Sequence, residues 1–198
     1  MVMEVSSRQT EIIEAAAKLL TTVGVSGLTI KNLAKEMQFS ESAIYRHFAS
    51  KEEIILTMLD YVMMGIGKET IAAMSPNLSE IDMLKLFFQK QFAFFHQNPY
   101  LTVVIFSDGL LEESTRINEK ILMILNSRKI IIEPLVAQAQ EKGELTKEIN
   151  AEEIVHIVMG SVRLLMFQWR ISQFGFDIQK RGKNLLDNLF KLILLKQP

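Results

Sequence analysis

The chain has 198 residues, enough for one or two small domains with a buried core, and its 48% hydrophobic content excludes a disordered polypeptide. Because cysteine is absent, disulfides and thiolate zinc sites are excluded, which suits a reducing cytoplasm. The formal net charge of -1 excludes a strongly basic nucleic-acid protein but leaves room for one locally basic domain.

Two short helices joined by a tight turn are predicted between Thr29 and Lys51. Thr29 can cap the first helix, and the interruption at residues 38–39 precedes a second cap, Ser40. The first helix has an apolar stripe at helical spacing, formed by Ile30, Leu33, Ala34 and Met37.

The second helix divides into a buried face and a free face. Ile44 and Phe48 lie four residues apart, so they share the face that holds this helix to the core. The outward side chains are those of Glu41, Ser42, Ala43 and Arg46, flanked by Tyr45, His47 and Lys51. This layout is typical of a helix-turn-helix that reads the DNA major groove, although an ordinary helical hairpin would share it. From residue 29 to 51, four cations face two acids, so the segment is basic by two charges.

The stretch from about Arg8 to Leu59 resembles the N-terminal domain of the tetracycline-repressor (TetR) family. The resemblance rests on Gly24 and Gly27 ahead of Leu28-Thr29-Ile30, on Leu33-Ala34, on Ser42-Ala43-Ile44-Tyr45-Arg46-His47-Phe48, and on Ser50-Lys51-Glu52. It implies a homodimeric bacterial transcription regulator, usually a repressor, that a small molecule releases from a palindromic operator in double-stranded DNA.

The same resemblance assigns roles within residues 29–51. By position, the phosphate contacts are Thr29, Tyr45, His47 and Lys51, the base-facing residues are Ser42, Ala43 and Arg46, and Ser40 caps the reading helix. Glu41 departs from the neutral or basic residue common there. An acid facing DNA is tolerable only if it accepts from a cytosine amino group or turns aside.

Helix-start signals and apolar stripes continue after this segment. Leu101–Phe106 is rich in β-branched residues, but no partner strand is evident, so a helix is predicted there too. One further helix is predicted from Lys51 toward Gly65, and others begin at a cap at Asn77, at Asn98-Pro99 and at Asn150. A long helix is predicted from Thr115 to Lys142, with a bend near Pro134 and a stop at Gly143. The final predicted helix runs from Asp177 to Lys196. The expected fold is all-α, with a three-helix helix-turn-helix domain at residues 1–52 and a helical ligand-binding and dimerisation domain at residues 53–198.

The last two predicted helices present wide apolar stripes that indicate a homodimer interface built as a four-helix bundle. Intramolecular core packing is the alternative, and Gly160 would permit close backbone approach. The stripes consist of Ile154, Ile157, Val158, Ser161, Val162, Leu165, Met166 and Trp169 in the first helix, and Leu185, Leu186, Leu189, Phe190, Ile193 and Leu194 in the second.

Phenylalanine and methionine are abundant beyond the reading domain, with 12 and 11 in the whole chain. Such side chains adapt to irregular apolar ligands, so an internal pocket for a small, largely apolar effector is a hypothesis beside plain core packing. The candidate ligand-binding residues are Phe88, Gln91, Phe92, Phe95, Phe106, Met166 and Phe167.

Gly65 and Gly67 weaken the helix that links the two predicted domains, because each costs about 1 kcal/mol relative to alanine inside a helix. They are either a hinge through which a ligand moves the reading helices, or residues that merely allow close packing or end the helix.

Other classes of function find little support. The chain has no nucleophile elbow, no zinc-protease motif and only three scattered histidines, so no enzyme, metal site or cofactor is expected. No apolar run approaches the roughly 18 residues that span a bilayer, and the acidic N-terminus does not resemble an export signal, so a cytoplasmic protein without membrane contact is expected. The remaining alternative is a helical lipid-binding, small-molecule-binding or adaptor protein that does not read DNA.

Overall fold

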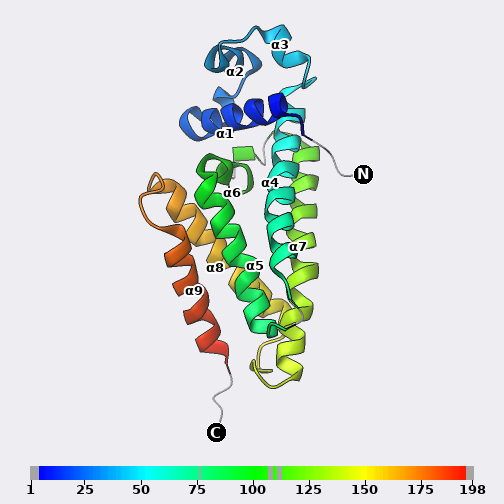
Figure 1. Cartoon of the computed structure of the whole chain (residues 1–198), viewed down its shortest axis with the longest axis vertical. Helices are drawn as coiled ribbons and strands as arrows, with labels where there is room; N and C mark the ends of the chain where they lie inside the picture. The colour runs from blue at the N-terminus through cyan, green and yellow to red at the C-terminus, as the bar shows by residue number, and fades with distance from the viewer. Residues whose placement is uncertain (1–4, 76, 107–108, 111–112, 195–198) are drawn as a thin grey trace. The chain divides into compact units, whose positions relative to one another are not determined.

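The computed structural model describes residues 5–75, 77–106, 109–110 and 113–194. Within these ranges the chain is helical and has no strand, and one isolated antiparallel bridge joins Leu145 to Leu194. Figure 1 shows the elements α1 (Ser7–Gly27), α2 (Ile30–Met37), α3 (Glu41–Tyr45), α4 (Lys51–Ala73), α5 (Glu80–Gln97), the 3-10 helix η1 (Pro99–Leu101), α6 (Thr102–Phe106), α7 (Thr115–Glu141), α8 (Ala151–Ile171) and α9 (Ile178–Ile193). The prediction of an all-α fold is confirmed.

The chain packs as two compact units. The first comprises Met1–Met64 with Asn98–Met123, and the second comprises Gly65–Gln97 with Ile124–Pro198. Both α4 and α7 therefore contribute residues to each unit. These units are a division by packing, and the functional division into residues 1–52 and 53–198 stays a prediction.

In the first unit, α1 packs against α2, η1 and α6. A capping box begins α1, in which the Ser6 hydroxyl accepts from the Gln9 N–H while the Gln9 side chain accepts from the Ser6 N–H. Near its end, Gly24 has φ 75° in the left-handed region that glycine adopts at low cost. The buried face of α1 consists of Ile12, Ile13, Ala16, Ala17, Leu19 and Leu20. It supplies the apolar surface on which the short helix α2 is held.

In the second unit, α9 lies alongside α5 and α8 (Figure 1). A Cβ atom on Gly182 of α9 would lie 2.3 Å from the Phe92 ring of α5, so only glycine permits this approach. The turn between α8 and α9 is closed by Trp169, whose Nε1–H donates to the Phe176 carbonyl at 2.8 Å. Gly182 thus permits the close approach of α9 to α5, and Trp169 holds the turn between α8 and α9.

The cap of α5 corrects the prediction. Ser79 directly precedes the first helical residue, and its hydroxyl accepts from the Asp82 N–H at 3.1 Å. Asn77 lies two residues too early to do this, because a capping oxygen reaches only the second or third N–H of the helix. The prediction that Asn77 caps this helix was therefore wrong.

Most other boundaries agree with the prediction. The Asn150 side chain accepts from the Glu153 N–H at 2.8 Å and begins α8. Residues 101–106 are helical, although the Asn98 side chain does not cap η1. Gly143, with φ 75°, follows the end of α7. The predicted end of the last helix, Lys196, lies outside the described residues.

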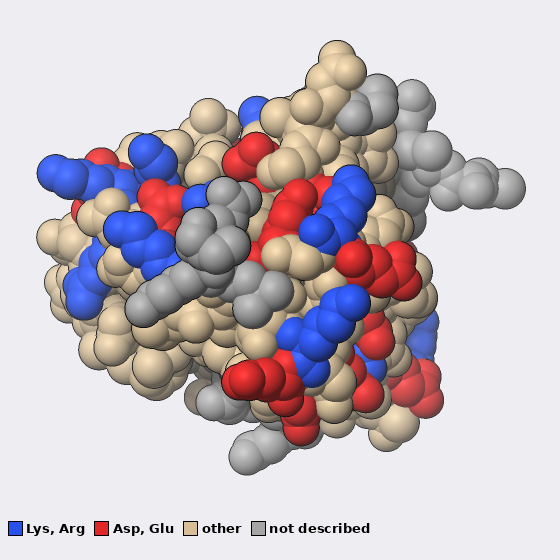
Figure 2. Space-filling view, turned by 90° about the horizontal axis from the view of Figure 1, so that it is seen from below, with Lys and Arg blue, Asp and Glu red and all other residues tan. Residues whose placement is uncertain are grey.

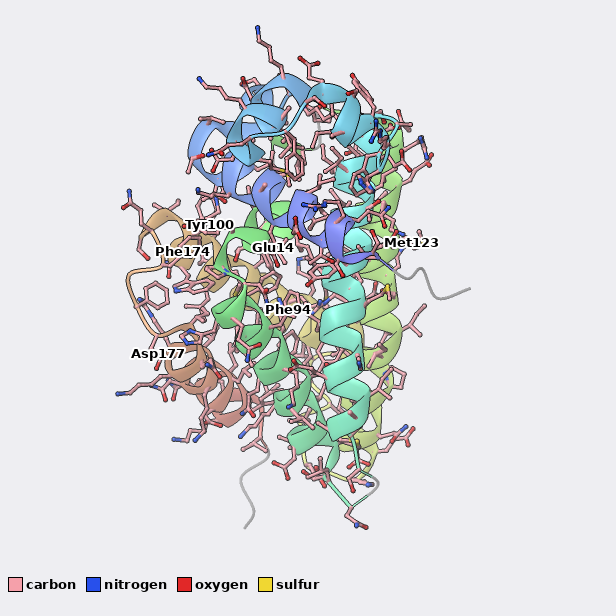
Figure 3. All side chains as sticks on the ribbon, turned by 45° about the horizontal axis from the view of Figure 1, so that its top comes forward. Glu14, Phe94, Tyr100, Met123, Phe174 and Asp177 are labelled. Atoms are coloured by element: carbon pink, nitrogen blue, oxygen red, sulfur yellow. The ribbon has the colours of Figure 1, made fainter. Side chains whose placement is uncertain are left out.

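The helix α4 continues through Gly65 and Gly67, and the two glycines differ in their surroundings. A Cβ atom on Gly65 would lie 2.3 Å from the Phe94 ring, which points from α5 toward α4 in Figure 3. A Cβ atom on Gly67 would meet nothing within 4 Å. Close packing therefore accounts for Gly65 and leaves Gly67 unexplained.

Candidate functional site

Each of α2 and α3 begins at a side-chain cap, and one left-handed residue forms the turn between them. The Thr29 hydroxyl accepts from the Asn32 N–H at 3.1 Å, and the Ser40 hydroxyl accepts from the Ala43 N–H at 3.2 Å. Gln38 has φ 55°, and its N–H donates to the carbonyls of Ala34 and Lys35. A residue in this conformation reverses the chain directly after a helix. The next helix, α3, can therefore begin as early as three residues after Gln38.

The two faces of α3 are those expected from the sequence. Ile44 is fully buried and Phe48 is 1% exposed, so they anchor the helix to the first unit. The side chains on the other face are open to solvent at Glu41, Ser42, Tyr45 and Arg46, whereas Ala43 and His47 are half-buried. A short helix that is anchored on one side and polar on the other can enter a DNA groove without unfolding.

Ion pairs decide which cations around α3 are available. The Lys18 ammonium lies 2.7 Å from the Glu36 carboxylate, and this hydrogen bond raises the pKa of Lys18. Among the described residues, Lys31, Lys35 and Arg46 have no carboxylate within 4.0 Å. Since Glu36 is already paired, these three side chains give the exposed side of α2 and α3 its positive charge.

Lys51 is the predicted phosphate contact that the fold itself engages. Its ammonium lies 2.7 Å from the Glu113 carboxylate and donates to the Val25 carbonyl at 3.0 Å. Its side chain is 26% exposed. A phosphate would therefore have to compete with Glu113 for this cation.

The Lys51 pair is the first of three ion pairs between α4 and the segment that contains Glu113 and the first residues of α7. Arg116 lies 2.6 Å from Glu52, and Lys120 pairs with Asp60. Arg116 and Lys120 are four residues apart, which places them on one side of α7. That spacing was visible in the sequence, but the partner helix was not.

An open groove lies beside these pairs in the first unit, with a volume of about 390 Å³. It is lined by Glu53, Leu56, Thr57, Asp60, Arg116, Glu119, Lys120 and Met123. Charged side chains of both signs surround it, and none of the candidate ligand-binding residues is among them. It does not resemble the enclosed apolar pocket that the sequence predicts.

The candidate ligand-binding residues do not form one group. The five that lie in the second unit and are at most 2% exposed are Phe88, Gln91, Phe92, Phe95 and Met166. Phe106 belongs to the first unit, and Phe167 is 38% exposed. Four of these five make a contiguous stripe on α5, because 88, 91, 92 and 95 follow helical spacing, and Met166 lies on α8. Sequence reasoning missed Arg128, a buried cation that donates a hydrogen bond to the Gln91 side chain.

The apolar stripe of α8 requires a correction. Most residues named for the dimer interface are core of the second unit instead, namely Ile154, Val158, Val162, Leu165, Met166 and Trp169. A second stripe of the same helix is exposed, formed by Ile157, Leu164, Phe167 and Ile171. The helix is apolar on two sides, and periodicity by itself does not say which side the chain's own core will cover.

One described helix, α8, is long and apolar enough to cross a membrane by length and composition alone, with a mean hydropathy of 1.2. The expectation that no segment meets this criterion was wrong. Core helices of soluble proteins meet it as well, and the buried stripe of α8 accounts for part of its hydropathy. Among the described residues, no group of three or more metal-ligating side chains occurs.

Two family models, one after the other, match most of the chain. Residues 12–58 match the bacterial regulatory proteins of the tetR family, and residues 61–195 match the C-terminal region of YsiA-like proteins. The first match covers the helix-turn-helix described above. The second covers well over half of the chain.

A sequence relative and a solved structure resemble the chain over most of its length. The nucleoid occlusion factor SlmA of Vibrio atlanticus is 29% identical over 173 residues, covering 87% of this chain and 88% of SlmA. The fatty acid degradation regulator FadR of Bacillus halodurans has the same fold, with a TM-score of 0.81 and 17% identity over 95% of this chain and 97% of FadR.

A second solved structure, FadR of Bacillus subtilis in complex with stearoyl-CoA, matches with a TM-score of 0.77 and 18% identity over 93% of this chain and 98% of that one. The helix-turn-helix geometry and both family models lead to one conclusion: the chain belongs to the TetR family of DNA-binding transcriptional regulators.

Proposed function

We propose that this protein binds a palindromic operator as a homodimer, represses transcription there, and is released by a small, largely apolar molecule. The observation that carries the proposal is the anchored segment from α3 to Phe48, in which Ile44 and Phe48 are buried while Ser42, Tyr45 and Arg46 are exposed. A helix with this division can bring side chains to base edges. In this proposal the functional division of the chain falls at residues 1–52 and 53–198.

The proposed contacts follow the TetR pattern. Ser42, Ala43 and Arg46 face the bases, and Ser40 orients the helix that carries them. The phosphate contacts are Thr29, Tyr45, His47 and Lys51. The exposure of Tyr45 and Arg46 supports these roles, whereas Lys51 reaches a phosphate only after it leaves Glu113.

The proposed dimer interface is formed by α8 and α9. The exposed stripe Ile157, Leu164, Phe167 and Ile171 supports it, because a monomer seldom leaves a continuous apolar stripe in water. Leu192, which is 81% exposed, adds to it from α9. Two reading helices must reach successive major grooves, about 34 Å apart, and a dimer supplies two.

The proposed effector binds within the second unit. Support comes from the buried aromatic stripe of α5 and from the B. subtilis FadR structure, which holds stearoyl-CoA. No catalytic step is needed for this role, and the cytoplasm is the compartment in which such a regulator meets DNA.

The similarity to SlmA favours one second candidate, a role in nucleoid occlusion. Both functions require DNA binding, so binding alone does not separate them. Mapping the bound sites in the genome does, because a local repressor occupies its own upstream region.

A titration of labelled DNA from the upstream region of its own gene, followed by fluorescence anisotropy, tests the main proposal. If each subunit neutralises about three phosphates, the dimer neutralises about six. A plot of the logarithm of the affinity against the logarithm of the salt concentration should then have a slope of about -5. Arg46→Ala should weaken binding by about 5- to 150-fold and relax sequence preference, whereas Tyr45→Phe should weaken binding to all sequences alike. A slope near zero, or no binding at low salt, contradicts DNA binding.

A further inference from the structure

Arg128 is a charged side chain inside the second unit. It lies on α7, is 6% exposed, and donates from Nη2 to the Oε1 atom of Gln91 on α5. Its Cζ atom lies 5.0 Å from the centre of the Phe87 ring. Gln91 is itself only 2% exposed, so this pair is part of the interior.

The described residues give Arg128 no counterion. No carboxylate lies within 4.0 Å of it, and the nearby acids Glu133 and Glu152 both pair with Lys129. Burial lowers the pKa of Arg128 to about 10, which still leaves it charged at neutral pH. A buried charge normally requires a partner of opposite sign, because removing it from water is costly.

A neutral amide and an aromatic ring satisfy this cation only in part. A guanidinium has five N–H donors, whereas among the described residues Arg128 donates to one side chain and lies over one aromatic ring. The two oxygens of a carboxylate match the parallel donors of a guanidinium. An arriving carboxylate would accept from Arg128 in place of the Gln91 carbonyl oxygen.

The surroundings of Arg128 are apolar. Ile124 and Ile132 lie one turn before and after it on α7, and both are at most 4% exposed. On α5, Phe88, Phe92 and Phe95 continue the face that carries Gln91. One cation set in an apolar interior suits a molecule with one negative charge and a hydrocarbon body.

We propose that Arg128 and Gln91 form the receptor for the head group of the effector, and that the effector is a monocarboxylate with an apolar tail. This inference rests on the proposed function, because it identifies the chemical class of the releasing molecule. The tail of the effector packs against the phenylalanine side chains of α5 in place of their present neighbours. The carboxylate separates Arg128 from Gln91. Binding therefore alters the packing of α5 against α7.

Calorimetric titration of the full-length protein with sodium dodecanoate and with dodecan-1-ol, at neutral pH, tests the inference. Both probes have the same tail, so their difference reports the head group. The wild type should bind dodecanoate about 10-fold or more tightly than the alcohol, because only the carboxylate neutralises the charge of Arg128 and can accept two parallel N–H bonds from it. Addition of dodecanoate should also release labelled operator DNA.

Two variants isolate the cation. Arg128→Met keeps the volume of the side chain and should bind the two probes equally. Gln91→Glu supplies an internal counterion, so it should lose dodecanoate selectivity without a lower melting temperature. Circular dichroism melts identify a variant that has failed to fold.

Equal binding of both probes by the wild type, no binding of either, or persistent selectivity in Arg128→Met would each overturn the inference. Titration of the protein with operator DNA, in the absence of either probe, tests the proposed DNA binding separately from the effector inference. If the wild type binds operator DNA but does not distinguish the probes, the effector class is wrong and the regulator remains.

Discussion

At the scale of single residues, Lys51 belongs both to the fold and to the proposed DNA contact. Its ammonium is 2.7 Å from the carboxylate of Glu113. An ion pair of this exposure contributes about 0–1 kcal/mol to stability, so a phosphate can displace it. The sequence indicates Lys51 as a phosphate contact, but the competing acid lies 62 positions away and was not predictable from it.

Glu113→Gln should tighten DNA binding by up to about 5-fold, because it leaves Lys51 free for a phosphate. Fluorescence anisotropy with operator DNA measures the change. Glu119→Gln is the matched control, since it removes one negative charge from nearby on α7, and no ion pair joins Glu119 to Lys51. Equal effects of both variants would mean that only total charge matters.

At the scale of helices, the packing inside the second unit depends on the close approach of α9 to α5. Hydrophobic periodicity predicted the apolar stripe of α5, but it carries no information about which residue of a distant helix faces Phe92. That residue is Gly182. The sequence pattern gives no sign of this role, because a glycine inside a helix has no apolar side chain to reveal it.

Gly182→Ala should lower the free energy of unfolding by about 1–3 kcal/mol, because the added methyl group overpacks against Phe92. Chemical denaturation monitored by circular dichroism measures it. Gly67→Ala, where a methyl group meets nothing within 4 Å, should instead stabilise α4 by up to about 1 kcal/mol. If Gly67→Ala also leaves the ligand response unaltered, α4 does not hinge there.

The start of α5 is tied to the end of α7 by an ion pair between Glu80 and Lys142, 2.6 Å apart. The hydrogen bond from Lys142 lowers the pKa of Glu80 from 4.5. A group whose pKa is lower in the folded state stabilises the fold at pH values above its unfolded pKa, and this contribution is lost as the pH falls through the folded value.

The melting temperature should therefore fall as the pH drops below about 4.5, and Glu80→Gln should make that fall shallower. Thermal melts across the acidic range measure it. Glu148→Gln, which removes an exposed acid from the loop before α8, should leave the profile close to that of the wild type. A profile unaffected by Glu80→Gln would show that other carboxylates govern acid stability.

At the scale of the whole molecule, the proposed function depends on how two copies associate and on where charge is concentrated. The formal net charge is only -1, and Figure 2 shows a face on which acidic and basic side chains are interspersed. Attraction to DNA must then come from the local cations of α2 and α3. Because one subunit would supply few phosphate contacts, the proposed operator binding would become tight through the proposed dimer.

Leu164→Glu should convert the proposed dimer to a monomer, because it places a charge in the exposed stripe of α8. Light scattering after gel filtration measures the mass. Operator affinity should fall by about 100-fold or more with the loss of the second half-site contact. Ile130→Glu is the control, since Ile130 is 73% exposed on α7. A variant Leu164→Glu that stays dimeric would contradict the proposed interface.

The sequence by itself determined the helices, the two caps around the turn and the inward face of α3, because these depend on spacing and on neighbours within a few residues. It also identified the family. Only the tertiary structure decided which stripe of α8 is core, which acid engages Lys51, and that Arg128 is buried beside Gln91. Each of these is a contact between residues distant in the chain, and local patterns do not record which distant residues meet.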